Sequence, residues 1–184
     1  MRALEALFLI GVEGVTEVLL VRHGDSYQDI TEVEDPPLSA LGRDQARRLA
    51  ERVRHLRPAA VYSSPYRRAL QTAQAITDDV RVDHRLVEIA LDVGVDGSLD
   101  FKEDPLAAAE RMRNVLDDVV SEHTGRRVVV VSHGAAIIAC LSDVLRLGPG
   151  QLRVLPYYTS ISTVRVLGDR RMVGALGDTA HLEP

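Results

Sequence analysis

Two histidines, His23 and His133, occupy equivalent positions in this 184-residue chain. Each follows a short run of valine and leucine, and each precedes a glycine. Such apolar runs are typical of strands that are buried on both faces of a parallel sheet. Ligands of open α/β sheets bind outside the carboxyl ends of the strands. The sequence therefore predicts that both imidazoles lie at one ligand-binding edge of a sheet; the alternative is two unrelated loop histidines.

Arginines stand close to this predicted edge. Arg22 adjoins His23, and Arg67 and Arg68 fall in the first turns of the helix predicted after the second strand. The guanidinium group offers a planar fork of donors that matches phosphate oxygens, and helix N-termini also favour anions. Successive helix residues point about 100° apart, so only one of the two neighbours should face the pocket. This pattern indicates a phosphate-ester site, whereas a solvated arginine face is the other interpretation of Arg67 and Arg68.

The elements that must position these residues alternate between strand and helix. Apolar runs predict buried strands over 18–21, 59–62 and 128–131, a short edge strand over 80–82, and strands over 160–166 and 172–176. Helices are predicted after the cap residue Ser39, from Ser64 and Pro65 to about Ile76, after Asp104 and Pro105, and from His133 to about Leu147. Residues 90–100 show no firm periodicity and are predicted to form a loop or flap. Alternation of this kind indicates one α/β domain in three layers, a mostly parallel central sheet with helices on both faces.

Composition and charge argue against several classes of protein. A formal net charge of −5 argues against a nucleic-acid-binding protein. No stretch approaches the ~20 apolar residues that span a bilayer, so no membrane association is expected. Residues 1–15 are interpreted as an N-terminal extension before a domain over 16–184, and their apolar start is compatible with a homodimer. The single cysteine, Cys140, excludes a disulfide framework within the chain and favours a cytoplasmic location.

Metal chemistry is not expected. The histidines lack the spacing of metal ligands, and no paired carboxylates suited to a hard cation are evident. We predict neither a catalytic metal nor a cofactor.

Several segments of the sequence together resemble the histidine phosphatase, or phosphoglycerate mutase-like, superfamily. The segments that carry the resemblance follow the family's order from about Thr16 to Leu182. They are Leu20-Val21-Arg22-His23-Gly24, Pro37-Leu38-Ser39 with Gly42 and Gln45-Ala46, Ser63-Ser64-Pro65-Tyr66-Arg67-Arg68-Ala69-Leu70-Gln71-Thr72-Ala73, Leu86-Val87-Glu88, Val131-Ser132-His133-Gly134 and Thr179-Ala180-His181-Leu182.

The resemblance implies a role for each matched residue. His23 would be the nucleophile that accepts the phosphoryl group, Arg22 and Arg68 would bind phosphate, and His133 would hydrogen-bond the transferred group. Glu88 matches the proton donor of the branch that places its acid after the third strand. The other branch has an aspartate next to the second histidine, and here Gly134 stands there.

The implied activity is hydrolysis of a small phosphate monoester through phosphohistidine. Phosphoryl transfer needs an in-line nucleophile, stabilisation of the equatorial oxygens and a protonated leaving group. A mutase needs an enclosed, strongly basic site, whereas the segment over 90–113 sets Lys102, Arg111 and Arg113 against several carboxylates, so hydrolysis is favoured. The alternatives are a cofactor-dependent phosphoglycerate mutase, a phosphoprotein or phosphohistidine phosphatase, and a phospho-binding module.

Two positions depart from the family pattern. Asp29 stands where many relatives have asparagine, and a carboxylate that faced inward there would repel phosphate. Val95-Asp96-Gly97 replaces an aromatic-acid-glycine motif. The segment between Glu88 and His133 is also short, which predicts only a small cap over the site.

Overall fold

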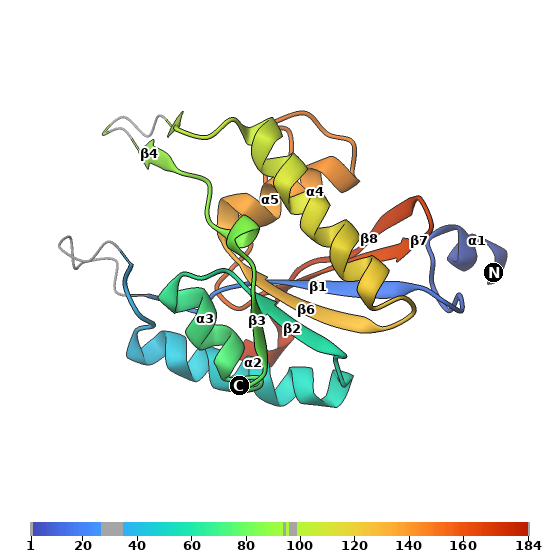
Figure 1. Ribbon diagram of the computed structural model, residues 1–184, viewed down its shortest axis with the longest axis horizontal. Coiled ribbons are helices and arrows are strands. Elements are labelled where there is room, and N and C mark those ends of the chain that lie inside the picture. Colours follow the sequence, from blue (N-terminus) through green and yellow to red (C-terminus); the bar gives the residue numbers. More distant parts are fainter. Residues whose placement is uncertain (1, 27–34, 94, 96–98, 184) are drawn as a thin grey trace.

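The computed structural model of the chain describes residues 2–26, 35–93, 95 and 99–183. Within them, a six-stranded sheet runs in the order β3-β2-β6-β1-β7-β8, with helices on both faces (Figure 1). Its strands are β1 (Thr16–Arg22), β2 (Ala60–Ser63), β3 (Val80–Val82), β6 (Arg127–Ser132), β7 (Ile161–Leu167) and β8 (Arg170–Asp178). The helices are α1 (Arg2–Leu7), α2 (Ala40–Leu56), α3 (Arg67–Gln74), α4 (Pro105–Glu122) and α5 (Gly134–Val144), with 3₁₀ turns η1 (His84–Leu86) and η2 (Ala180–Leu182).

The sheet is mostly parallel, as predicted. Strands β3, β2, β6 and β1 run in one direction, whereas β7 is antiparallel to both β1 and β8. The two central strands pair in register from Glu17 opposite Arg127 to Arg22 opposite Ser132. The residues that follow these strands therefore emerge side by side.

Each central strand divides its side chains between two hydrophobic cores. Val18 and Leu20 of β1 pack towards α4 and α5, while Leu19 and Val21 pack towards α2 and α3. Figure 1 shows these helix pairs on opposite faces of the sheet. Because both faces are buried, both sets of positions must be apolar, which explains the unbroken valine and leucine runs. The predicted three-layer α/β domain is confirmed.

The predicted capping residues are confirmed at the starts of two helices. The Ser39 hydroxyl accepts a hydrogen bond from the Gly42 N–H at 2.9 Å and caps α2. Asp104 accepts from the Leu106 N–H at 2.9 Å, with Pro105 as the first residue of α4. Each cap satisfies a backbone donor that the first helical turn leaves without a partner.

The predicted start of α3 is wrong. The helix begins at Arg67 rather than Pro65, and it ends at Gln74. The Ser64 hydroxyl lies 2.9 Å from His133 Nε2, and the carboxylate of Asp35 accepts from the Arg67 N–H at 2.9 and 3.0 Å. A residue distant in sequence thus caps this helix. The helix after His133 is also shorter than predicted and ends at Val144.

The loop predicted over 90–100 contains strands instead. β4 (Leu91–Val93) and β5 (Leu99–Phe101) pair antiparallel, with Leu91 opposite Phe101. Figure 1 shows this hairpin projecting from the end of the molecule at which the central parallel strands finish. It occupies the position expected of a small cap.

Candidate active site

The two histidines meet at the carboxyl edge of the sheet, as the sequence predicts. His23 follows β1 and His133 follows β6, and the centroids of their rings lie 5.1 Å apart. His23 is 4% exposed, and His133 is fully buried. The adjacent parallel strands therefore bring together two imidazoles that are 110 positions apart in the chain.

The partners of His23 determine which ring nitrogen carries the proton. Nδ1 lies 2.7 Å from the carbonyl oxygen of Gly24, which can only accept a hydrogen bond. Nε2 accepts a hydrogen bond at 3.2 Å from Nε of Arg68, which can only donate. Nδ1 therefore bears the proton, and the lone pair of Nε2 faces the arginine.

Burial and positive charge keep both imidazoles neutral. Burial lowers the pKa of His23 to about 3; the charges of Arg68 and Arg22 act in the same direction, and the hydrogen bond to Gly24 opposes them. Burial lowers the pKa of His133 to about 2, assisted by the charges of the nearby arginines. A neutral imidazole retains the lone pair that a nucleophile requires.

The loop after His23 is held by close backbone contacts. The Gly24 N–H donates to the hydroxyl of Thr72 at 3.0 Å, and the Asp25 N–H donates to the side chain of Gln45 at 2.9 Å. A Cβ atom on Gly42 would lie 1.9 Å from the carbonyl oxygen of Asp25. Only glycine at position 42 allows the first turn of α2 to approach the loop this closely.

Arg22 lies between an aromatic ring and a backbone carbonyl. Its Cζ is 4.2 Å from the centroid of the Tyr158 ring, and its Nη1 donates to the carbonyl of Pro156 at 2.9 Å. Two buried atoms of the pocket, Arg22 Nε and His133 Nδ1, have no hydrogen-bond partner among the described residues. Buried polar atoms are normally paired, so these two suit the oxygens of a bound anion.

Arg68, and not Arg67, faces the pocket. Its side chain is 15% exposed and contacts His23, and its Nη1 lies 3.6 Å from Asp35. Arg67 is exposed. Arg68 is therefore the arginine of this pair that contacts His23.

Glu88 reaches the same edge of the sheet from the segment after η1. Its Oε1 accepts hydrogen bonds from the N–H groups of Ile89 and Ala136, both at 3.0 Å. Its Oε2 accepts one from Ala135 at 3.4 Å. The carboxylate thus lies against the first turn of α5, directly after His133, and its charge acts on Arg68.

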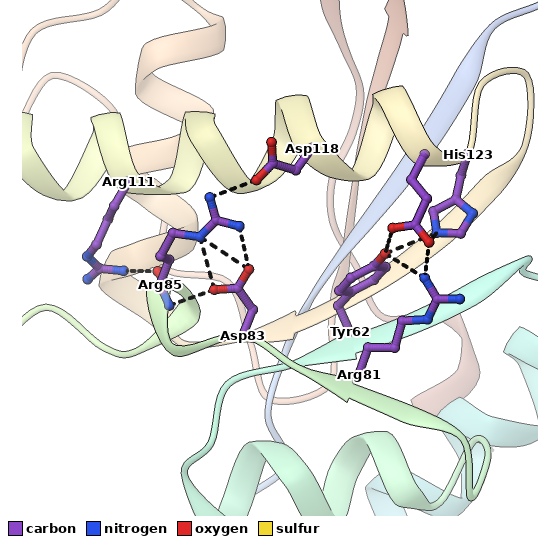
Figure 2. A network of polar contacts seen from close by, with 8 residues as sticks. Tyr62, Arg81, Asp83, Arg85, Arg111, Asp118 and His123 are labelled. Atoms are coloured by element: carbon purple, nitrogen blue, oxygen red, sulfur yellow. Dashed lines mark hydrogen bonds and ion pairs between the residues drawn. The ribbon is translucent and has the colours of Figure 1, made fainter.

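Two side chains fix the segment that carries Glu88. Nη1 of Arg111 donates to the carbonyl of Arg85 at 2.6 Å, and the buried hydroxyl of Ser132 donates to the carbonyl of Leu86 at 2.8 Å. Figure 2 shows Arg111 reaching from α4 to η1, where Arg85 also pairs with Asp83 and Asp118. A second cluster in that view joins Tyr62 to Arg81, Glu122 and His123. Helix α4 thereby orients the candidate acid.

Comparison with known proteins identifies the family. The profile of the histidine phosphatase superfamily (branch 1) matches residues 18–98 and 96–179. The chain belongs to the histidine phosphatase superfamily. It is 30% identical to the probable phosphoglycerate mutase GpmB of Yersinia enterocolitica, over 91% of this chain and 95% of that protein. It is also 30% identical to phosphoglycerate mutase-like protein 4 of Arabidopsis thaliana, over 91% and 87% of the two chains.

Solved structures of this superfamily share the fold. A phosphoserine phosphatase from Entamoeba histolytica, in complex with 3-phosphoglyceric acid, is 25% identical with a TM-score of 0.79, over 91% of this chain and all of that one. A mycobacterial glucosyl-3-phosphoglycerate phosphatase has a TM-score of 0.73 at 23% identity, over 89% and 99% of the two chains. The predicted family and fold class are confirmed.

Several residues of this histidine phosphatase site could not be found from sequence. Asp35 and Tyr158 contact Arg68 and Arg22 from loops that carried no chemical signal of their own. Ser64 lies within the family motif, but its contact with His133 was not predicted. Ser64 was assigned a different task, as a helix cap. Asp29 and the Asp96-Gly97 pair lie outside the described residues.

The remaining histidines have different surroundings. His55 and His84 are exposed. His181 Nε2 lies 3.1 Å from the hydroxyl of Thr159, whose backbone N–H donates to the carbonyl of Arg22.

In the part of the chain that the structure describes, no cluster of three or more potential ligands could hold a metal ion. Nor does any described helix have the length and apolarity to cross a membrane.

Proposed function

We propose that this histidine phosphatase hydrolyses phosphate monoesters of a small metabolite through a phosphohistidine at His23. The observation that carries the proposal is the proton arrangement of His23. Gly24 and Arg68 together require a neutral ring whose Nε2 lone pair faces a phosphate-binding group. A nucleophile in this state is ready to attack at neutral pH.

In the first step, Nε2 of His23 attacks phosphorus and the bond to the ester oxygen breaks. Arg68 exchanges its hydrogen bond with Nε2 for one with a phosphoryl oxygen. Arg22 Nε and His133 Nδ1 donate hydrogen bonds to the other oxygens, while the hydroxyl of Ser64 donates a hydrogen bond to His133 Nε2. Glu88 protonates the departing alkoxide. Positioning and charge stabilisation of this kind supply most of the rate enhancement in phosphoryl transfer.

In the second step, water attacks the phosphorus of phosphohistidine. The Glu88 carboxylate takes a proton from that water, the P–N bond breaks, and His23 regains its lone pair. Inorganic phosphate leaves with the oxygen of water. The hydrogen bonds from Ala135 and Ala136 hold the Glu88 carboxylate beside the pocket during this exchange.

The charges of the cap support hydrolysis rather than mutase activity. Lys102 pairs with Asp92 and Asp100. Arg111 pairs with Glu103, and Arg113 pairs with Asp143. Each of these three cations therefore faces a carboxylate, which weakens its ability to hold a second phosphate group. The names of the curated relatives make mutase activity the second candidate, and it would appear as phosphate transfer between phosphoglycerates that requires a bisphosphate.

A trapping experiment tests the proposal. Purified protein should hydrolyse an aryl phosphate in the presence of EDTA, which also tests the proposed independence from metals. Denaturation during turnover of ³²P-labelled substrate should yield an acid-labile phosphoenzyme. His23→Ala should abolish both signals, and the exposed His55→Ala should retain both. Loss of activity with EDTA refutes the metal-free mechanism, and phosphoenzyme in His23→Ala refutes the assignment of the nucleophile.

Three further assignments accompany this proposal. We propose that the catalytic domain comprises residues 16–184 and that residues 1–15 are an extension. The buried free thiol of Cys140, whose pKa is raised to about 12 by burial, supports a cytoplasmic location. Exposed apolar side chains of Leu4, Leu7 and Phe8 support a homodimer through the extension, which sedimentation of the full chain and of a chain lacking residues 1–15 would test.

A further inference from the structure

A cavity lies at the opposite end of the sheet from His23. It has a volume of about 570 Å³ and opens between the N-terminal segment and the amino ends of β1 and β6. Figure 1 shows α1 at this end of the molecule, away from the β4–β5 hairpin. Small-molecule sites commonly have volumes of ~300–1,000 Å³. The size of the cavity is therefore suited to a metabolite.

The charge of this cavity opposes that of the whole chain. Four arginines line it together with one acidic residue, Glu17; they are Arg57, Arg126, Arg127 and Arg165. The lining thus has an excess of three positive charges in a chain of net charge −5. Arg57 and Arg126 are exposed, whereas Arg127 and Arg165 are partly buried. Because all four line one cavity, they form a local basic field.

Glu17 neutralises only part of this field. Its carboxylate accepts hydrogen bonds from Nε of Arg127 at 3.0 Å and from Nε of Arg165 at 3.1 Å. Burial raises the pKa of Glu17, but the hydrogen bonds and charges of the two arginines outweigh burial and lower it. Among the described residues, the guanidinium groups of Arg57 and Arg126 have neither a hydrogen-bond nor an ion-pair partner.

Backbone geometry fixes where the arginines stand. Arg57 ends α2 in the left-handed conformation, with a φ of 50°, and its N–H donates to the carbonyl of Arg54. Arg127 also donates from Nη1 to the carbonyl of Leu56 at 2.9 Å, which joins the end of α2 to the start of β6. Arg127 is therefore joined to the end of α2 without help from Glu17.

Apolar side chains form another part of the cavity wall. Leu9, Val12 and Val15 form it, and Leu9 is only 1% exposed despite its place in a terminal segment. These residues precede position 18, where the match to the superfamily begins. The cavity thus depends on a segment that lies before the residues matched by the superfamily profile.

We propose that this cavity binds a small molecule that carries a diphosphate group. Guanidinium forks bind phosphate oxygens in pairs, so Arg57 and Arg126 can each take one phosphoryl group. The excess positive charge suits the multiple negative charge of a diphosphate, and the apolar wall accommodates the organic part of the ligand. Because the site lies apart from His23, its occupancy is independent of the catalytic proposal.

Calorimetric titration of the full chain with pyrophosphate tests this inference. Arg57→Gln/Arg126→Gln should weaken binding by about tenfold or more, because two charge-assisted hydrogen-bond donors are lost. The control is Arg47→Gln/Arg48→Gln, which removes the same charge from α2, where both arginines pair with Asp44. The control should bind pyrophosphate within about twofold of the wild type, since diffuse surface charge is screened by salt.

All three proteins share the catalytic pocket, so pyrophosphate bound there cancels in the comparison. They should also hydrolyse an aryl phosphate at equal kcat/KM, which verifies the fold of each variant. Equal pyrophosphate affinity in the wild type and Arg57→Gln/Arg126→Gln would overturn the inference. An equal loss in both double variants would do so as well, because it would show only a general effect of charge.

Discussion

The two ends of the sheet use arginine in opposite ways. At the carboxyl end, Arg68 is mostly buried and donates to a histidine, so its charge disfavours protonation of the ring. At the amino end, Arg127 and Arg165 surround Glu17 and favour its carboxylate form. The same side chain therefore keeps one neighbour neutral and another ionised. The identity of the partner decides whether an arginine prepares a nucleophile or forms an ion pair.

The largest expected effect comes from removing the arginine at the catalytic end. Arg68→Ala should reduce kcat/KM for an aryl phosphate by about 10³-fold, within the range for loss of one donor that stabilises a transition state. The adjacent Arg67→Ala should change kcat/KM by less than about twofold, because Arg67 is exposed and its backbone N–H still binds Asp35. Steady-state kinetics on both variants measures the difference.

Arg57→Ala extends the same comparison to the amino end. It should leave kcat/KM unchanged, since Arg57 lines the distant cavity. A similar loss in Arg57→Ala and Arg68→Ala would show that long-range charge, and not contact with His23, sets the rate.

The next effect concerns the candidate acid. Glu88→Gln should lower kcat on an alkyl phosphate by about 10²-fold, because general acid catalysis typically contributes 10²–10⁴-fold. The loss should be much smaller on an aryl phosphate whose leaving group needs no proton. Glutamine can still accept a hydrogen bond from Ala136, so the local structure is retained. Kinetics on the two substrate types gives the ratio.

Glu110→Gln is the matched control, since Glu110 is exposed on α4. Equal losses on both substrates in Glu88→Gln would indicate a structural role for Glu88. Full activity on alkyl phosphates would favour the phosphohistidine phosphatase or phospho-binding interpretation.

The sequence predicts the central layer of this molecule better than its periphery. The valine runs of β1 and β6 identify strands buried on both faces, and that placement alone brings His23 and His133 to one edge. The β4–β5 hairpin was missed because its strands are three residues long, too short for their apolar–polar–apolar alternation to predict a strand. Short strands take their stability from pairing, which composition does not reveal.

The residues of the candidate site likewise include some that the sequence predicts and some that it does not. Arg68 could be chosen over Arg67 only through the family motif. Helical geometry requires that just one of the two side chains faces the pocket, but it does not decide which one. Asp35 and Tyr158 reach Arg68 and Arg22 from loops, across 33 and 136 positions of the chain. Contacts between residues so far apart in the chain form only in the complete fold, so local sequence signals cannot predict them.

The pH dependence of stability should distinguish the buried imidazoles from exposed ones. In the unfolded chain a histidine takes up a proton below its ordinary pKa of ~6.5, whereas folded His133 stays neutral down to about 2. The unfolded state therefore binds more protons, and the free energy of unfolding falls as pH decreases below ~6.5. Each buried histidine should contribute a slope of about 1.4 kcal/mol per pH unit.

His133→Asn should remove one such contribution. Urea unfolding between pH 6.0 and 4.5 should give a slope that is about 1.4 kcal/mol per pH unit shallower than in the wild type. His55→Asn should leave the slope unchanged, because His55 is exposed. An unchanged slope in His133→Asn would mean that His133 is protonated in the folded state, contrary to the effect of its burial.

The smallest effect is expected at the amino end of the sheet. Arg165→Gln should lower the free energy of unfolding by about 0.5 kcal/mol, because Glu17 keeps its bond to Arg127 and partly exposed ion pairs contribute little. Urea unfolding in low and high salt measures the change, which should shrink as salt screens the pair. The Arg165 side chain also lies across Gly174, where an added Cβ atom would be 2.6 Å from Nη1. A loss above ~2 kcal/mol that does not vary with salt would show that packing of the Arg165 stem on β8 contributes more to stability than its charge. The arginines at the two ends of the sheet would then differ in packing rather than in the charge of their partners.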